Sequence, residues 1–226
     1  MVDMSREETI FGDDWPYSKA KSSLLRSAAI VMREQGPRSA TLKNIAGKAG
    51  VTEPAIFRHF DGVDGVFQSL YAVVELFYGK FVEQFKDGEL RGLDRLEAAN
   101  DRILATLKDN ADFAYPIAKP DPIFRQYAKL REKVAELDAG LRAAVVECLK
   151  EAKSAGHLVP GVDVEPFATA LIGVLFQVMY SWLEDVDKYD PRKEGKKALG
   201  MLYSLARKPG TEGPVAAKPK ATRKKA

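Results

Sequence analysis

The sequence predicts an all-α fold in which a three-helix N-terminal head precedes a larger helical domain. Three observations support this prediction. Apolar residues recur every three or four positions in successive stretches, which is the pattern of amphipathic helices. No stretch of the 226 residues alternates apolar and polar residues as a half-buried strand does. Glycine and proline lie mainly between the periodic stretches, where they end helices.

The first helix of the head is expected to begin near Ser18. It presents an apolar face through residues 24–32 and ends at Gly36-Pro37. A short second helix is predicted over residues 41–48, with Ile45 and Ala46 turned inward. The head therefore opens with two helices that pack through small and aliphatic side chains.

A tight turn at Ala49–Val51 is expected to lead into the third helix, over residues 53–59. Thr52 suits the N-cap of this helix, and Pro54 is tolerated in its first turn. Ile56 and Phe57 are expected to be buried against the other two helices.

The remaining chain predicts a chiefly helical domain. Pro116, Pro120 and Pro122 break one stretch into short helical pieces, and Gly156–Asp163 is a connection. Further helices are predicted over residues 63–85, 93–108, 123–137, 139–155, 165–184 and 192–206. The expected division of the chain is a flexible arm at 1–17, the three-helix head at 18–62, the larger helical domain at 63–207, and a disordered basic tail at 208–226.

The net charge of +3 conceals an uneven distribution. Residues 19–60 hold eight Lys or Arg and two Glu, whereas residues 61–207 hold more acids than bases. The tail at 208–226 holds six Lys or Arg and one Glu, among Ala, Pro and Thr. A basic block before an acidic body indicates that the first block binds an anionic polymer.

Composition also argues against several classes of protein. The single cysteine, Cys148, excludes an intrachain disulfide, and the two histidines, His59 and His157, offer little for a metal site or for His-based catalysis. Cys148 is interpreted as a small buried residue, with oxidant sensing as the alternative. No catalytic set or phosphate-binding loop stands out, so neither an enzyme nor a cofactor is expected. Because the N-terminus lacks a secretion signal, we expect a cytoplasmic protein.

The most specific pattern lies in residues 41–60. Two short helices joined by a turn that contains Gly50 match helix-turn-helix geometry. Gly50 can adopt the positive φ of a sharp turn, and Ile45, Val51 and Ile56 are expected to fix the angle between the helices. The second helix would then project polar side chains into the major groove of DNA.

This segment resembles the DNA-binding region of the tetracycline-repressor (TetR) family of bacterial transcription regulators. The resemblance runs from the basic first helix through Ala49-Gly50-Val51-Thr52 to Ile56–Phe60, and the rest of the chain is similar only in layout. It implies a homodimer that represses genes from the nucleoid and releases DNA when a small molecule binds. The resemblance implies DNA contacts by Thr41, Lys43, Thr52, Glu53, Ala55 and His59, and the basic charge of the head adds Lys48 and Arg58 to the predicted DNA-binding residues.

The resemblance implies different roles within this set. Thr52, Glu53 and Ala55 would lie near base edges, whereas Thr41 and Lys43 would lie near phosphates. Glu53 keeps two interpretations: it accepts a hydrogen bond from a cytosine amino group, or it only favours the positive end of its own helix.

Two departures from the family pattern bear on phosphate binding. Many members have Tyr where Phe57 stands, so a phenolic hydroxyl is missing. Many have Lys where Val63 stands, and the neighbouring Asp61 and Asp64 would repel phosphate. Affinity is therefore expected to depend more on Lys43, Lys48, Arg58 and the Lys19–Arg26 face.

Residues 166–183 carry no charge, and their length is near the lower limit for a membrane-spanning helix. Gln177 and the flanking Glu165 and Glu184 favour instead a buried helix, in a four-helix dimer interface or wholly within its own core. The predicted dimer face comprises Leu171, Val174, Leu175, Val178, Trp182, Met201, Leu202 and Leu205. A second face, which includes Ala168, Ile172, Phe176, Tyr180 and Leu183, is expected to pack on its own domain.

Aromatic residues are numerous between residues 63 and 207, and most are expected to form the core. The resemblance implies that some of them line a pocket for an apolar or aromatic effector. The predicted ligand-binding residues are Phe81, Phe113, Tyr115, Tyr127, Phe176, Gln177 and Tyr180.

The sequence thus predicts a DNA-binding transcriptional regulator, most simply a repressor released from a pseudo-palindromic operator by a small molecule. Its expected partners are double-stranded DNA, a second copy of the chain and an effector, with no membrane, metal or cofactor. The first alternative is an activator or an effector-independent regulator. A more distant alternative is a helical ligand-binding protein or enzyme that does not bind DNA.

Overall fold

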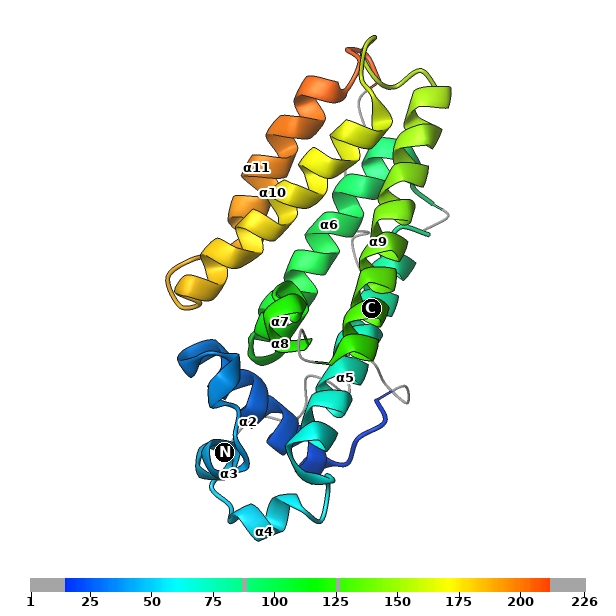
Figure 1. Cartoon of the computed structure of the whole chain (residues 1–226). Coiled ribbons are helices and arrows are strands. Elements are labelled where there is room, and N and C mark those ends of the chain that lie inside the picture. The colour runs from blue at the N-terminus through cyan, green and yellow to red at the C-terminus, as the bar shows by residue number, and fades with distance from the viewer. Residues whose placement is uncertain (1–14, 87–88, 125–126, 212–226) are drawn as a thin grey trace, which may run out of the picture.

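The computed structural model describes residues 15–86, 89–124 and 127–211. This part of the chain consists of helices, turns and loops, with one isolated bridge between Leu158 and Arg207 (Figure 1). The predicted all-α fold is confirmed. Residues 1–14 of the predicted arm and residues 212–226 of the predicted tail lie outside the described residues.

The head contains α2 (Lys19–Gln35), the short 3-10 helix η2 (Pro37–Ser39), α3 (Leu42–Ala49) and α4 (Glu53–Ile56). Helix α2 begins where the Ser18 hydroxyl accepts a hydrogen bond from the backbone N–H of Lys21. It ends at Gly36, whose φ of 86° lies in the region that favours glycine. Helices α2 and α3 pack together through a face that includes Leu25, Ile45 and Ala46, all of them buried.

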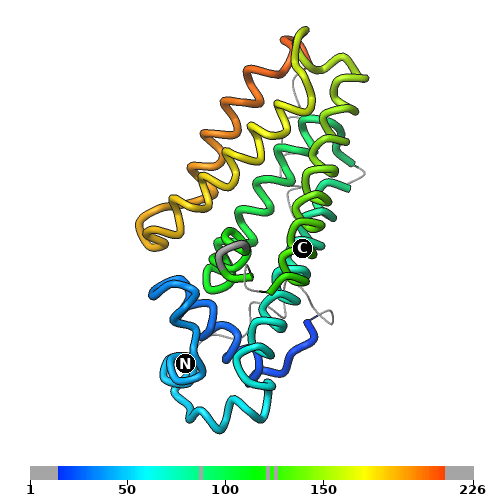
Figure 2. Tube along the Cα trace, viewed as in Figure 1, coloured from blue at the N-terminus to red at the C-terminus, as the bar shows by residue number. Residues whose placement is uncertain are grey.

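The larger domain is built from α5 to α11. Their bounds are α5 (Gly62–Gln84), α6 (Gly92–Asp109), α7 (Ala111–Ala118), α8 (Pro120–Phe124), α9 (Ala128–Ser154), α10 (Val164–Glu184) and α11 (Pro191–Ala206). Figure 2 shows that α5 leaves the head, α6 returns toward it, and α7 and α8 lie beside the head. Helix α9 leaves again, α10 returns, and α11 runs alongside α10.

Two helix predictions were wrong. The stretches predicted over 123–137 and 139–155 give one helix over Ala128–Ser154, α9, whereas residues 123–124 belong to α8; no proline interrupts α9, and its interior glycine, Gly140, is exposed. The helix continues there at only the modest cost of an interior glycine. Helix α4 ends at Ile56, three residues before the predicted end, and residues 57–59 form a turn.

The segment before α2 packs against the larger domain. The indole N–H of Trp15 donates to the Ser22 hydroxyl (2.8 Å), and its ring lies 6.0 Å from that of Phe113 in α7. The Tyr17 hydroxyl donates to the backbone carbonyl of Ser69 in α5 (3.3 Å). Residues 15–17, predicted to be part of a loose arm, therefore connect the head to α5 and α7.

The beginning of the predicted tail is also held in place. The backbone N–H of Lys208 donates to the carbonyl of His157 (2.8 Å), and the N–H of Val159 donates to the carbonyl of Ala206 (2.9 Å). These bonds attach the end of α11 to the connection between α9 and α10.

Helix α10 is long and apolar enough, by length and composition, to cross a membrane. In this fold it packs on α7, α9 and α11, and its buried residues include Ala168, Leu175 and Trp182. A core helix of a globular protein has the same composition, so this pattern is weak evidence for a membrane span.

Candidate DNA-binding head and effector pocket

The turn between α3 and α4 is defined by Gly50, which adopts a left-handed conformation (φ 69°, ψ 30°). The backbone N–H of Val51 then donates back to the carbonyl of Ala46 (3.0 Å), which closes the end of α3. Ile45 and Ile56 are fully buried on the inner faces of the two helices. The sequence folds locally in this way because only glycine adopts this φ without strain.

The N-caps of the two helices differ in how their hydroxyls are used. Thr41 accepts a hydrogen bond from the backbone N–H of Asn44 (3.2 Å), which satisfies the start of α3. Thr52, at the same position of α4, makes no side-chain capping bond and is exposed. The Thr52 hydroxyl is therefore available to a ligand at the start of α4, beside the exposed Glu53.

The exposed cations of the head are not equivalent. Lys43 and Arg58 are exposed and form no ion pair within the described part of the chain. Lys48 instead lies 2.8 Å from a carboxylate oxygen of Glu34, so part of its charge is neutralised. Lys43 and Arg58 are the stronger candidates for phosphate contacts, because binding to an anion costs them no existing pair.

Two other predicted contact residues are only half-exposed. Ala55 and His59 lie on the side of α4 and its following turn that leans toward the head. The carboxylate of Asp64 accepts a hydrogen bond from the Tyr127 hydroxyl (2.7 Å), and Asp61 is exposed. Of the predicted set, Thr41, Lys43, Lys48, Thr52, Glu53 and Arg58 are exposed, and all eight residues lie between the start of α3 and the turn after α4.

Three predictions about the head need correction. Phe57, predicted to be buried, is exposed because its helical backbone places it on the side of the exposed Glu53, whereas Ile56 and Phe60 are buried against the head. Val51, predicted to fix the helix angle, is also exposed. Arg26, predicted to belong to the basic DNA-facing surface, is buried, and its Nη1 lies 3.3 Å from Oδ2 of Asp112 in α7.

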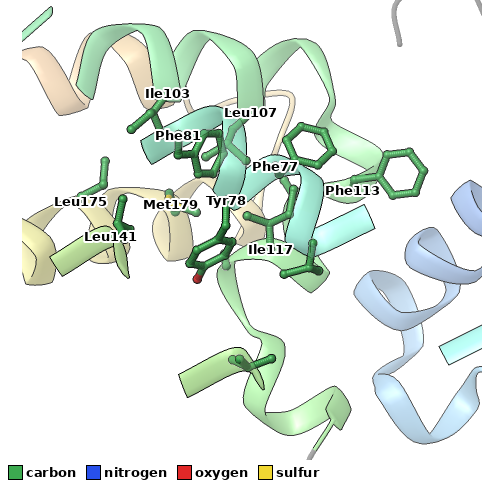
Figure 3. Close-up of a cluster of buried hydrophobic side chains, with 14 of the residues drawn as sticks. Phe77, Tyr78, Phe81, Ile103, Leu107, Phe113, Ile117, Leu141, Leu175 and Met179 are labelled. Carbon is green, nitrogen blue, oxygen red and sulfur yellow. The ribbon is translucent and has the colours of Figure 1, made fainter. Parts of the chain in front are cut away.

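The larger domain contains an almost wholly apolar pocket between α5, α6, α7, α9 and α10. The cavity is nearly closed in this structure, with a volume of about 10 Å³, room for about one water molecule. The lining comprises Tyr78, Phe81, Ile103, Ile117, Leu141, Leu175, Phe176 and Met179. Figure 3 shows several of these side chains gathered with Phe77 and Leu107 in the core of the domain.

Only two of the predicted ligand-binding residues, Phe81 and Phe176, line this pocket. Phe113 is fully buried against Trp15 and Phe77, and Tyr127 contacts Asp64 at the head end of α5. Gln177 is exposed and donates to Ser181 (3.3 Å).

Tyr115 and Tyr180 are half-buried, and the Lys119 ammonium lies over both rings, 5.9 and 4.9 Å from their centroids. Neither tyrosine belongs to the pocket lining. The other five predicted residues do not line this pocket, and their role in ligand binding stays a prediction.

Sequence reasoning missed Tyr78, which supplies the polar group nearest the pocket. Its hydroxyl donates to Oδ1 of Asp138 (2.8 Å), and burial together with that carboxylate raises the pKa of Tyr78. Burial likewise raises the pKa of Asp138. The available signal was the spacing of Tyr78 and Phe81, which places both on one side of α5.

The predicted dimer face on α10 needs a similar correction. Leu171, Leu175, Val178 and Trp182 are buried within their own chain, so they cannot contribute area to a contact with a second copy. Ile172, Phe176, Tyr180 and Leu183, predicted to face inward, are only half-buried. On α11, by contrast, Met201 and Leu205 expose 60% and 67% of their surface. Val174 and Leu202 are half-exposed. Dimerisation stays a prediction, and Val174, Met201, Leu202 and Leu205 are the predicted residues with surface left for it.

An exposed helix-turn-helix at one end of a helical domain with an apolar pocket defines a class of protein: the DNA-binding transcription regulators. Residues 24–70 match the family model described as bacterial regulatory proteins, tetR family. The match covers most of the head and the start of α5, and it agrees with the resemblance that residues 41–60 predicted.

Comparison with individual proteins agrees with this assignment. The chain is 22% identical to the HTH-type transcriptional repressor BepR of Brucella suis over 196 residues, which cover 85% of this chain and 94% of BepR. The structure of FadR from Bacillus subtilis in complex with stearoyl-CoA has a TM-score of 0.62 at 21% identity, covering 81% of this chain and 98% of FadR. The SmeT–triclosan complex, SmeT being a repressor of Stenotrophomonas maltophilia, has a TM-score of 0.66 at 19% identity and covers 89% and 99% of the two chains.

Proposed function

We propose that this protein represses transcription as a homodimer bound to a pseudo-palindromic operator on the nucleoid, and that an apolar small molecule releases it. The α10–α11 surface would join the two copies. The two recognition helices would then lie about 34–36 Å apart, in successive major grooves. The apolar pocket of the larger domain would hold the effector.

One observation carries this proposal: helix α7 contacts both the head and the pocket. At its N-terminus, Asp112 pairs with Arg26, and the carbonyl of Ala111 accepts a hydrogen bond from Nη1 of Arg33 (3.2 Å). Five residues after Asp112, Ile117 lines the pocket. An effector that displaces Ile117 would therefore move the residues that hold α2 of the head.

Helix α5 offers a second connection. It begins at Gly62, directly after the turn that follows α4, and it carries Tyr78 and Phe81 of the pocket lining. Because no loop separates the head from this helix, tilting α5 would change the distance between the two heads of a dimer. Linkage then requires effector and DNA to weaken each other's binding by the same factor.

The chemistry of the effector follows from the lining. Seven of the eight lining residues have no polar side-chain atom that could bind a charged ligand, and the eighth is Tyr78. An apolar or aromatic effector with at most a small polar group matches the chemistry of this lining, and because the cavity is small, the effector would have to displace lining side chains such as Ile117 to enter. The ligands in the FadR and SmeT structures, stearoyl-CoA and triclosan, both carry large apolar groups and serve as probes.

The test begins with selection of duplexes that the full-length protein binds from a random pool. Lys43→Ala and Arg58→Ala should weaken binding to all sequences alike and reduce the salt dependence by about one phosphate contact each. Lys150→Ala, at an exposed position of α9, is the matched control and should change neither. In transcription from a promoter that carries the selected site, the protein should lower RNA synthesis. An increase would favour the activator alternative.

The release step is tested with triclosan and stearoyl-CoA added to the DNA complex. Leu141→Phe enlarges a side chain of the pocket lining and should reduce the response to a bound probe while DNA affinity stays the same. A probe that binds in the pocket and leaves DNA affinity unchanged would contradict the proposal.

A further inference from the structure

Phe57, directly after α4, exposes 58% of its surface, although phenylalanine is among the side chains that folded proteins bury most often. Val51, in the turn before α4, is also exposed. Among the described residues, two other large apolar side chains are exposed, Met201 and Leu205, and both lie on α11. These four side chains fall in two places of the fold, around α4 and on α11, and exposed apolar side chains that gather are candidates for contact with another molecule.

The position of Phe57 indicates which molecule it contacts. Its backbone (φ −63°, ψ −15°) continues the turn of α4, so it lies four residues after Glu53 and on the same side of the helix. Ile56 and Phe60 are buried and fix the other side against the head. Figure 1 shows α4 at the end of the molecule away from α10 and α11. Phe57 therefore extends the exposed surface formed by Thr52 and Glu53, with which a helix-turn-helix enters the major groove.

The chemistry of Phe57 restricts the kind of contact it can make. Its side chain has no donor or acceptor, so it cannot form a hydrogen bond with a phosphate or with the polar edge of a base. The apolar group that the major groove presents is the C5-methyl of thymine, and apolar side chains recognise thymine through it. The exposed cations Lys43 and Arg58 supply the charge that holds DNA against this end of the head.

We propose that Phe57 packs against a thymine methyl group in each operator half-site and thereby selects an A·T pair at that position. This inference rests on the proposed DNA-binding function and adds to it a residue that reads a base without a hydrogen bond. It also gives a reason for the exposure of an aromatic ring that has no place in the core of the head.

The experiment uses the full-length protein and the duplex it selects from a random pool. Each thymidine of the half-site is replaced in turn by deoxyuridine, which removes only the methyl group. At one position per half-site the wild-type protein should lose about fourfold in affinity, the effect of one buried methyl group. Phe57→Ala should bind the thymine duplex more weakly than wild type and should show no further loss with deoxyuridine at that position.

Two variants make the result specific. Phe57→Tyr keeps the ring and should keep the deoxyuridine response. Val51→Ala shortens the neighbouring exposed side chain and should also keep it. Because Phe57 is exposed, the thermal unfolding of Phe57→Ala should match that of wild type, which separates loss of contact from loss of fold.

Four outcomes would overturn the proposal. If the affinity of the wild-type protein is unchanged by deoxyuridine at every position, the protein contacts no thymine methyl group. Equal deoxyuridine losses for wild type and Phe57→Ala would assign the methyl contact to another residue. A uniform loss by Phe57→Ala on all sequences would assign Phe57 to the sugar-phosphate backbone, and a change in oligomeric state with unchanged DNA affinity would assign it to a protein contact. If the wild-type protein selects no duplex at all, the DNA-binding function itself is wrong.

Discussion

Arg26 of α2 and Asp112 of α7 form an ion pair between the head and the larger domain, with 3.3 Å between Nη1 and Oδ2. Arg26 is buried, and its guanidinium also lies over the ring of Phe113, 5.6 Å from the centroid. The pair links a helix of the DNA-binding head directly to the helix that carries Ile117 into the pocket. The orientation of the head therefore depends on a charged contact largely shielded from water.

Replacement of Asp112 by Asn should lower the free energy of unfolding by about 2 kcal/mol, because the buried Arg26 keeps its charge and loses the Asp112 carboxylate. Urea denaturation measures this change. Asp101→Asn is the matched control, since Asp101 pairs with Arg192 at an exposed site and should cost less than about 1 kcal/mol. Equal losses of unfolding free energy in the two variants would show that the Arg26–Asp112 pair stabilises the fold no more than an exposed pair does.

Leu205→Lys should dissociate the proposed homodimer. Leu205 exposes 67% of its surface in the single chain, and an ammonium group placed in an apolar interface loses its hydration. The dimer dissociation constant should rise by at least about tenfold, measured by analytical ultracentrifugation. Lys150→Glu also changes a charge at an exposed position, on α9, and should leave the dimer intact. A Leu205→Lys protein that remains dimeric would remove α11 from the interface.

Glu151 should make stability depend on pH. The hydrogen bond from the backbone N–H of Gly92 (3.1 Å), with Arg95 and Arg91 nearby, lowers the pKa of Glu151 below its ordinary value of 4.5. A lowered carboxyl pKa contributes stability that is fully present above pH 4.5 and is lost as the pH falls through the lowered value.

Glu151→Gln should therefore cost about 1 kcal/mol at neutral pH, and its difference from wild type should close in acid. Urea titrations over a series of pH values test this. A constant difference across the series would mean that the carboxylate charge is not involved.

The basic tail should increase non-specific DNA binding. Truncation after Thr211 removes five Lys or Arg and one Glu while keeping the residues that bond to His157. The dependence of the logarithm of affinity on the logarithm of salt concentration should become shallower. A full-length chain in which those five cations are Gln should behave like the truncated one. An unchanged slope in both would remove the tail from the DNA contact.

The parts of the fold that local chemistry determines were predictable from the sequence. Gly50 tolerates the positive φ of the turn because glycine has no Cβ. Ile45 and Ile56, on either side of the turn, are buried as the pattern predicted. The end of α4 could not be predicted in the same way, because nothing in residues 53–59 signals that the helix stops at Ile56 and that Phe57 is exposed. Its exposure follows from how the head packs rather than from its own propensity.

The faces of α10 and the position of the pocket could not be predicted for a different reason. Helix α10 is apolar on all sides, so its pattern does not tell whether Leu171 or Ile172 faces its own chain. The pocket unites Tyr78 with Leu141 and Leu175, which lie far apart in sequence. Such a site depends on how α5, α6, α7, α9 and α10 pack, and the spacing of residues within one helix does not predict it.

The contact between Trp15 and Phe113 has a consequence for following the switch. The sequence contains two tryptophans, and the other, Trp182, is buried in α10. A displacement of α7 would change the surroundings of the Trp15 indole, 6.0 Å from the Phe113 ring, and hence its fluorescence. With Trp182→Phe, Trp15 is the only indole emitter, so the chain carries a built-in optical signal for the state of its head.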